Sequence, residues 1–175
     1  RGHHLISANK IAGSGDSADY NRLQEIQRAN GVLWRHNATV GAGLPVQYAL
    51  KDLCDSGDRI TNIGGVFSGT LSWLFAHYDG EQPFSELVLR AKDLGITEPD
   101  PRDDLSGKDM QRKLLILARE AGVQLDIEDI GLESMVPATL EGVSRQEFLD
   151  RILRMDREAT MKTAPGIPGG ICCAE

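Results

Sequence analysis

The sequence predicts one helix that is buried on every side. Its helical pattern runs from Ser106 to Gly122 and contains the unbroken apolar run 114–118. A helix that is apolar all round belongs in a protein core, because no face of it suits solvent. The chain has 175 residues, 41% of them hydrophobic and 26% charged, which is enough to build a core of ordinary size.

The remaining pattern predicts few strands and more helices. Alternating or β-branched runs predict strands, at 4–10, 32–40, 60–67 and 127–136. Helical periodicity with capping residues predicts helices, at 18–29, 45–53, 71–78, 83–95 and 145–161. Because the two kinds of element do not alternate strictly, the class indicated is α+β, with a mixed or antiparallel sheet and helices on one face.

Charge and cysteine usage exclude several classes of protein. The formal net charge is −7 without a basic cluster, which argues against a nucleic-acid partner. The longest apolar runs fall well short of the ~20 residues of a membrane span. The three cysteines, Cys54, Cys172 and Cys173, have neither zinc-ligand nor disulfide spacing, so a reducing, cytoplasmic setting is expected.

The segment from Glu98 to Lys113 is the one that carries chemistry. It is rich in carboxylates, and its prolines exclude helix and central strand over 97–104. Ser106 is predicted to cap the helix that follows, which places Asp109 and Lys113 one turn apart on one face. An ordinary capping box with a helix ion pair explains the same spacing. A calcium loop is a poor alternative, because the alternating Asp pattern with its glycine is missing.

The segment from Gly95 to Lys113 resembles the homoserine dehydrogenase signature, which is long and chemically mixed. Three further segments agree with the family in the same order, at 8–10, 37–45 and 65–72. Their sequences are most similar to the homoserine dehydrogenase half of a bifunctional aspartate kinase/homoserine dehydrogenase. The resemblance covers residues 4 to about 140.

The resemblance implies an oxidoreductase that interconverts L-homoserine and L-aspartate 4-semialdehyde with NADP or NAD, in threonine and methionine biosynthesis. It implies that Lys113 is the acid/base at the reacting oxygen and that Lys10 lies between cofactor and substrate. A nearby ammonium group would stabilise or protonate the carbonyl oxygen as hydride arrives, which fits these roles independently.

The resemblance also implies which residues hold the amino acid. The carboxylates of Glu98 and Asp109 would bind its ammonium group, and Asp104 would support them. Gly95 would approach substrate and cofactor through its backbone, since it has no side chain.

A monovalent cation, Na⁺ or K⁺, is a further implication. In the family, backbone carbonyls at the positions of Val40, Ala42 and Leu44 bind it together with a carboxylate. Asn37 stands at the carboxylate position, so a weaker site is expected. The glycines of this segment also suit a turn that needs positive φ, and both explanations can hold together.

No dinucleotide fingerprint occurs in the sequence. The Gly-x-Gly pairs at 13–15 and 41–43 both lack the third glycine. We therefore expect an upstream Rossmann domain to be absent from this chain and most of the NADP or NAD site to lie outside it. The missing partners would be that nucleotide-binding domain and, in a bifunctional parent, the aspartate kinase domain.

The domain organisation predicted on this basis has three parts. Residues 1–31 form the edge of the nucleotide-binding domain with a linking helix, 32–160 form the substrate-binding, catalytic and dimerisation domain, and 161–175 form a flexible tail. A homodimer that binds a small amino acid but is inactive as an isolated chain is expected. The alternative is a non-catalytic dimerisation or interaction module that keeps the same fold.

Overall fold

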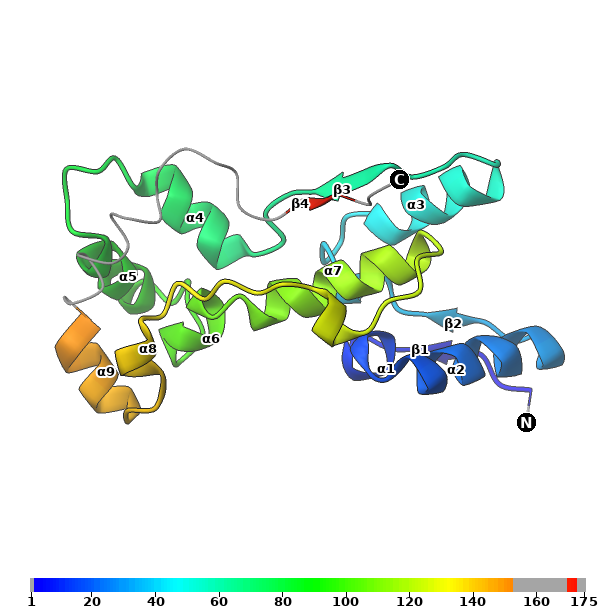
Figure 1. Cartoon of the computed structure of the whole chain (residues 1–175), viewed down its shortest axis with the longest axis horizontal. Helices are drawn as coiled ribbons and strands as arrows, with labels where there is room; N and C mark the ends of the chain where they lie inside the picture. Colours follow the sequence, from blue (N-terminus) through cyan, green and yellow to red (C-terminus); the bar gives the residue numbers. More distant parts are fainter. Residues whose placement is uncertain (1, 153–169, 173–175) are drawn as a thin grey trace. The chain divides into compact units, whose positions relative to one another are not determined.

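The computed structural model describes residues 2–152 and 170–172. Figure 1 shows the elements in chain order: β1 (Leu5–Ile6), α1 (Ile11–Ser14), α2 (Ser17–Asn30), β2 (Trp34–Arg35), η1 (Asn37–Thr39), α3 (Val46–Asp55), β3 (Asn62–Gly64), α4 (Gly69–His77), α5 (Phe84–Asp93), α6 (Pro101–Leu105), α7 (Lys108–Glu120), η2 (Ile127–Asp129), α8 (Ala138–Glu141), α9 (Arg145–Arg151) and β4 (Gly170–Cys172). Within the described residues, β1 and β2 pair in parallel and β3 and β4 pair antiparallel, in two separate two-stranded sheets. The α+β class is confirmed.

The chain folds into two compact units. Among the described residues, the first unit consists of 2–67, 111–131 and 170–172, and the second of 68–110 and 132–152. Helix α7 therefore contributes its first residues to the second unit and the rest to the first. The predicted division of the chain at residues 32 and 161 stays a prediction.

The core of the first unit is built on α7. The whole run 114–118 is buried, which confirms that this part of the helix is enclosed by the core. Val40 and Leu50 pack into one cluster with Ile116 and Leu117. Leu114 and Leu115 form a second cluster with Ile130, and Phe67 packs against both clusters.

The core of the second unit lies between short helices. Its largest fully buried side chains come from α4, α5, α6, α8, α9 and the residue that follows α9, and are Leu74, Phe84, Leu87, Leu105, Leu140, Phe148 and Ile152. Tyr78 meets Phe84 edge-on, with ring centroids 5.4 Å apart. Aromatic rings favour this arrangement, because the positive ring edge then faces the negative ring face.

The predicted exclusion of helix from 97–104 is wrong, because α6 begins at Pro101. A proline is tolerated in the first turn of a helix, where its missing N–H would have no partner. Asp100 is the N-cap, and its carboxylate accepts a hydrogen bond from the Arg102 N–H at 3.0 Å. The first-turn proline and its capping aspartate thus start a helix here.

All four predicted strands are shorter or absent, and the segments 4–10 and 60–67 keep only Leu5–Ile6 and Asn62–Gly64. In 32–40 only Trp34–Arg35 is strand, because the Thr39 hydroxyl and N–H both donate to the His36 carbonyl and close a 3-10 turn. In 127–136 the structure has η2 instead, and Asp126 and Asp129 cap each other's backbone at its start. Side-chain hydrogen bonds to the local backbone override the β-propensity of both segments.

The predicted helices shift only at their ends. Gly31 ends α2 in the left-handed conformation, with φ 59°, as the Asn-Gly pair predicts. The predicted helix 145–161 is present as α9, and its residues beyond 152 lie outside the described part of the chain. Most of the predicted tail also lies outside it, although residues 170–172 form β4. Within the described residues, no helix has the length and apolar character needed to cross a membrane.

Candidate functional site

Lys113 on α7 is held by a contact with the main chain at Phe67. The Lys113 Nζ donates a hydrogen bond to the Phe67 carbonyl oxygen at 2.7 Å, and the side chain is half-buried. Phe67 itself is packed against the core residues next to Lys113 on α7. The lysine is therefore fixed at the edge of the first unit's core, where a buried helix gives it little freedom to move.

Lys10 lies in the same unit, at the start of α1. Its carbonyl accepts hydrogen bonds from the N–H groups of Gly13 and Ser14, at 3.0 and 2.9 Å. The Ser14 hydroxyl donates to the same oxygen at 3.0 Å. The backbone of Lys10 is therefore held by the turn that follows it.

The predicted ammonium-binding carboxylates belong to the second unit. The Glu98 N–H donates to the Asp104 Oδ2 at 2.8 Å, so the structure brings these two residues together. The Glu98 side chain is exposed, whereas Asp104 and Asp109 are half-buried. Gly95 follows α5 with φ 70°, a conformation that favours glycine. The exposed Glu98 carboxylate is thus free of the core and oriented by a backbone contact to α6.

The Ser106 hydroxyl accepts a hydrogen bond from the Lys108 N–H at 3.4 Å, so its side chain caps the first N–H of α7, although Ser106 itself lies in the preceding turn. It is the C-cap of α6, Gly107 intervenes with φ 73°, and α7 begins at Lys108. Asp109 is therefore the second residue of α7, and its spacing to Lys113 is unchanged. The predicted site residues divide between the units: Lys10, Asn37, Val40, Ala42, Leu44 and Lys113 lie in the first, and Gly95, Glu98, Asp104 and Asp109 in the second.

The candidate cation loop has an unusual backbone. Ala42 has φ 50° and is the one non-glycine residue with positive φ within the described part of the chain. Such a conformation is costly for a residue with a Cβ and persists only where the surroundings impose it. Val40 is fully buried beside the loop, and the Leu44 N–H donates to the Gly41 carbonyl at 2.9 Å. The described residues contain no cluster of three or more His, Cys, Asp or Glu that could hold a metal ion.

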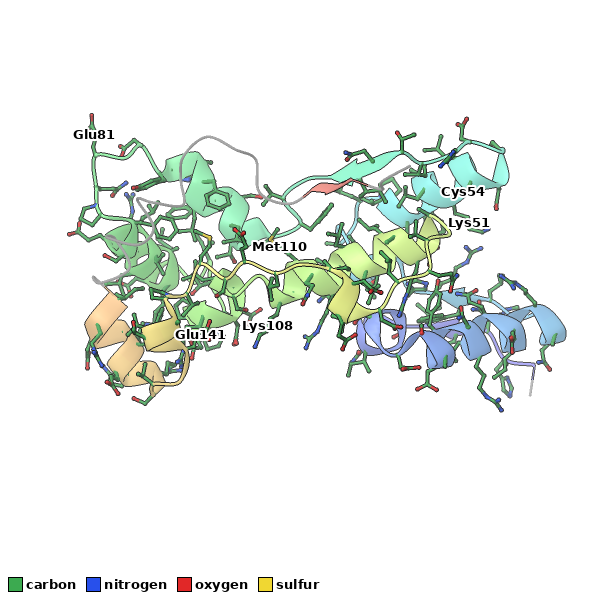
Figure 2. The ribbon with its side chains drawn as sticks, viewed as in Figure 1. Lys51, Cys54, Glu81, Lys108, Met110 and Glu141 are labelled. Carbon is green, nitrogen blue, oxygen red and sulfur yellow. The ribbon has the colours of Figure 1, made fainter. Side chains whose placement is uncertain are left out.

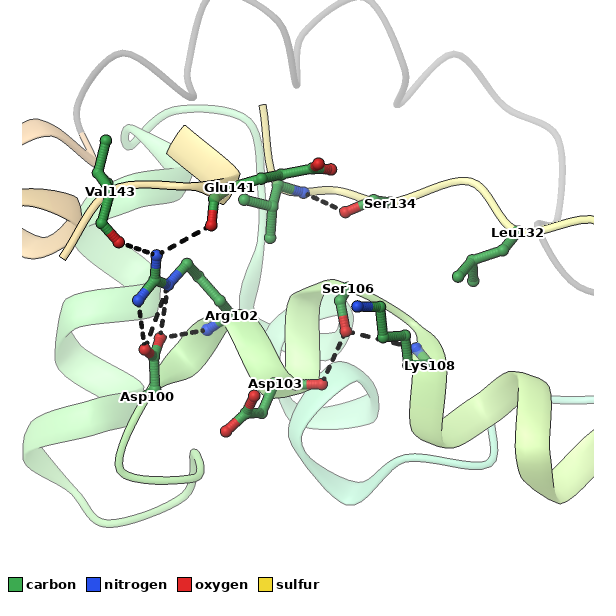
Figure 3. A pocket seen from close by; sticks show the side chains of 10 residues that line it. Asp100, Arg102, Asp103, Ser106, Lys108, Leu132, Ser134, Glu141 and Val143 are labelled. Carbon is green, nitrogen blue, oxygen red and sulfur yellow. Dashed lines mark hydrogen bonds and ion pairs between the residues drawn. The ribbon is translucent and has the colours of Figure 1, made fainter. Parts of the chain in front are cut away.

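A pocket of about 490 Å³ lies in the second unit (Figure 3). Its lining residues come from α6, the start of α7 and the segment 132–143, and are Asp100, Arg102, Asp103, Ser106, Lys108, Leu132, Ser134, Val136, Glu141 and Val143. None of the residues predicted for the active site is among them. Lys108, labelled in Figure 2, is exposed at this end of α7.

Arg102 makes most of the side-chain hydrogen bonds among the residues of this pocket, and it was not predicted from the sequence. Its guanidinium donates to both oxygens of Asp100, with the shortest contact 2.6 Å from Nη2 to Oδ2. Nη1 donates to the Val143 carbonyl at 2.7 Å, and the guanidinium lies 5.1 Å from the centre of the Phe148 ring. Figure 3 shows the contacts of Arg102 with Asp100 and with the Val143 carbonyl. An arginine directly after the prolines of an acidic loop is the signal that could have indicated it.

The ion pair shifts the pKa values of Asp100 and Arg102 in opposite directions. The hydrogen bond from Arg102 holds the pKa of the Asp100 carboxyl below its usual range, and its positive charge acts in the same direction. The same hydrogen bond raises the pKa of Arg102. The two side chains are 23% and 17% exposed for Asp100 and Arg102, so water screens the pair only partly. The pair therefore fixes the segment that leads from Glu98 into α6.

Comparison with known proteins agrees with the resemblance found in the sequence. The homoserine dehydrogenase family profile matches residues 45–165. A bifunctional aspartokinase/homoserine dehydrogenase 2 of Escherichia coli (strain K12) is 55% identical over 149 residues, which cover 85% of this chain and 18% of that protein.

Solved structures share the fold. A Candida auris protein of unknown function has a TM-score of 0.86 and 40% identity, covering 92% of this chain and 47% of that one. A homoserine dehydrogenase from Thiobacillus denitrificans has a TM-score of 0.64 and 27% identity, covering 83% and 32% respectively. The chain thus spans less than half the length of each of these proteins.

Replacement of Asp100 by Asn should remove a pH-dependent part of the stability. Asn keeps the cap on the Arg102 N–H but cannot carry the charge. Because the pKa of Asp100 is lowered in the folded state, its contribution is present above about pH 4 and is lost as the pH falls through the lowered pKa. Urea unfolding followed across pH should therefore show a deficit of about 1 kcal/mol near neutrality that narrows in acid.

The matched control for this measurement is Asp55→Asn. Its exposed pair with Lys51 on α3, labelled in Figure 2, has side chains 63% and 54% exposed and should contribute little. A deficit for Asp100→Asn that stays constant from neutral pH into acid would contradict the assignment.

Proposed function

The chain belongs to the homoserine dehydrogenase family, and we propose that it supplies the amino-acid-binding and acid–base residues for the interconversion of L-homoserine and L-aspartate 4-semialdehyde. The pathway served would be threonine and methionine biosynthesis. The observation that carries the proposal is the complete signature segment 95–113, in which Glu98 is bound to Asp104 and Lys113 is fixed by a carbonyl.

The proposed substrate-binding residues are Glu98 and Asp109, assisted by Asp104. Homoserine carries an ammonium group, and carboxylates form strong charge-assisted hydrogen bonds with such a group. Asp104 accepts from the Glu98 N–H and so orients the backbone that carries the Glu98 carboxylate. Gly95, with its positive φ and no side chain, would let ligand approach the main chain.

Lys113 is the proposed acid/base. In the reducing direction its ammonium group donates a proton to the carbonyl oxygen, which becomes the hydroxyl of homoserine. In the oxidising direction the neutral amine removes that hydroxyl proton. The hydrogen bond from Nζ to the Phe67 carbonyl holds the end of the side chain in place for this role.

NADP or NAD, when bound, supplies or accepts the hydride at the carbon next to that oxygen. Lys10 is proposed to lie between cofactor and substrate, and its carbonyl is held by three donors from its own turn. Gly95 is the other proposed contact to the cofactor. Most of the cofactor site is proposed to lie in a separate nucleotide-binding domain, because the sequence has no Gly-x-Gly-x-x-Gly.

Three finer features complete the proposal. A Na⁺ or K⁺ ion would be held by the carbonyls of Val40, Ala42 and Leu44 with the Asn37 amide, and the imposed φ of Ala42 supports a fixed loop there. A homodimer formed through this domain is supported by the family resemblance. A cytoplasmic location is supported by the cysteine pattern, with Cys54 present as a free thiol.

Replacement of Lys113 by Ala in the complete natural polypeptide should lower kcat for homoserine oxidation. General acid–base catalysis typically contributes on the order of 10²–10⁴-fold, so a loss of that size is expected. The assay follows the near-ultraviolet absorbance of reduced nicotinamide. Lys108→Ala, which removes an exposed lysine of the same helix, is the control and should keep its activity. Retained kcat in Lys113→Ala would reject the acid/base assignment.

Replacement of Glu98 by Gln should act mainly on binding. Removal of one charged partner of the ammonium group should raise KM for homoserine about tenfold or more. Glu86→Gln, an exposed glutamate on α5, provides the comparison. An unchanged KM with a much lower kcat would move Glu98 out of the binding role.

The chain of 175 residues by itself should not oxidise homoserine when supplied with NADP or NAD. Its sequence has no dinucleotide fingerprint to hold the hydride acceptor. A complete relative serves as the positive control. Turnover by the isolated chain would show that a cofactor site lies within it, and lack of turnover by the complete polypeptide would favour the alternative of a non-catalytic dimerisation module.

A further inference from the structure

We propose that Arg119 is a positioning residue, which sets the backbone of the Lys10 turn against the helix that carries Lys113. The inference rests on the proposed function for the roles of the two lysines. All of the contacts that carry it lie within the first unit. Arg119 is on α7, six residues after Lys113, and its side chain is only 2% exposed.

The guanidinium of Arg119 binds the backbone of α1 directly. Nη1 donates to the carbonyl oxygens of Gly13 and Gly15, at 3.0 and 2.8 Å. Nε and Nη2 donate to the Leu125 carbonyl, at 3.1 and 2.9 Å, and Nη2 also donates to the Asp126 carboxylate at 3.1 Å. One side chain thus joins the end of α1 to the segment that follows α7.

The buried charge is compensated on two sides. Asp126 provides the opposite charge and also accepts from the N–H and hydroxyl of Ser17, at 2.9 and 2.8 Å. The ring of Tyr20 lies 4.9 Å from the guanidinium carbon, which suits a cation–π contact. Burial raises the pKa of Tyr20 to about 12, so this ring stays neutral beside the arginine. A buried arginine requires such partners, because its desolvation is otherwise costly.

The turn held by Arg119 is the one that holds Lys10. The Gly13 N–H donates a hydrogen bond to the Lys10 carbonyl, and the Gly13 carbonyl accepts one from Arg119. A Cβ at Gly13 would lie 3.1 Å from Ile116 Cγ1, so α1 and α7 are already in close contact there. Two residues of α7, Ile116 and Arg119, therefore contact Gly13, and together they fix the position of the Lys10 turn along α7 and its distance from that helix.

Lysine cannot replace arginine in this position. The contacts require donors on three nitrogens arranged in a plane, which reach carbonyls from two separate segments. The ammonium group of a lysine would keep a positive charge near Asp126, but it would reach only some of the carbonyl oxygens that Arg119 binds. A shift of about 1 Å in a positioning element can cost about 10²-fold in rate, which is why the difference should be visible in catalysis.

The test compares Arg119→Lys with the wild type in the complete natural polypeptide. We expect kcat for homoserine oxidation to fall about 10- to 100-fold, with KM for homoserine changed by less than about twofold. Arg112→Lys, at an exposed position of the same helix, is the control and should match the wild type. An unchanged kcat in Arg119→Lys would overturn the proposal.

A double-mutant cycle with Lys10→Ala separates positioning from general stabilisation. If Arg119 acts through Lys10, Arg119→Lys should cost little further activity once Lys10 is removed. If Arg119→Lys lowered kcat by the same factor in the wild type and in Lys10→Ala, Arg119 would act independently of Lys10, and the proposal would be overturned.

Gly13→Ala tests the same geometry without touching Arg119, and it keeps the proposal testable if Arg119→Lys does not fold. Its new Cβ would lie 3.1 Å from Ile116 Cγ1, so the two must separate by a few tenths of an ångström, and a lower kcat with unchanged KM is expected if α1 is the part that moves. Hydrogen exchange on the 175-residue chain provides a readout without catalysis: the N–H groups of Gly13 and Ser14 should exchange faster in Arg119→Lys while the amides of 114–118 stay protected. Unchanged exchange at α1 in Arg119→Lys would contradict the proposal that Arg119 holds α1. Faster exchange at α1 in Arg119→Lys, combined with a wild-type polypeptide that has no activity, would reject only the proposed function.

Discussion

The contact between the Arg119 guanidinium and the carbonyls around α1 gives the first unit its geometry. Burial of the apolar run 114–118 drives α7 into the core, but hydrophobic burial has no direction and tolerates sliding and rotation. Hydrogen bonds from a planar guanidinium do have direction. Arg119 therefore converts a helix that is merely buried into one with a defined register against α1 and against the segment that begins at Leu125.

In the second unit, too, an arginine side chain binds main-chain oxygens of a separate segment. Arg102 binds the Asp100 carboxylate on one side and the Val143 carbonyl on the other, with the Phe148 ring beneath it. Both arginines thus connect segments far apart in sequence through main-chain oxygens, and both have one aspartate and one aromatic ring as partners. The short helices α8 and α9 bury few residues each, so directional contacts of this kind help to hold them in place.

The sequence predicted the helices well where periodicity and caps agreed, as for α2, which ends at Gly31, and for the buried centre of α7. It also led to the family, because the segment 95–113 is long and chemically distinctive. Prediction was wrong where side chains bind their own backbone: at Asp100 before Pro101, at Thr39 and at Asp126. Those bonds depend on local geometry, which hydrophobic patterning does not report.

The candidate site was predictable only as a set of residue types. The sequence indicated Glu98, Asp104, Asp109 and Lys113 together, and the structure pairs Glu98 with Asp104. The contact of Lys113 with the Phe67 carbonyl was not foreseeable, because a main-chain carbonyl has no residue signature. That contact also has a genetic consequence. Any amino acid at position 67 brings a carbonyl oxygen, so no single substitution there can delete the acceptor that holds Nζ. A mutational scan of position 67 would reveal only the demands on ring packing, and the contact itself would remain invisible to it.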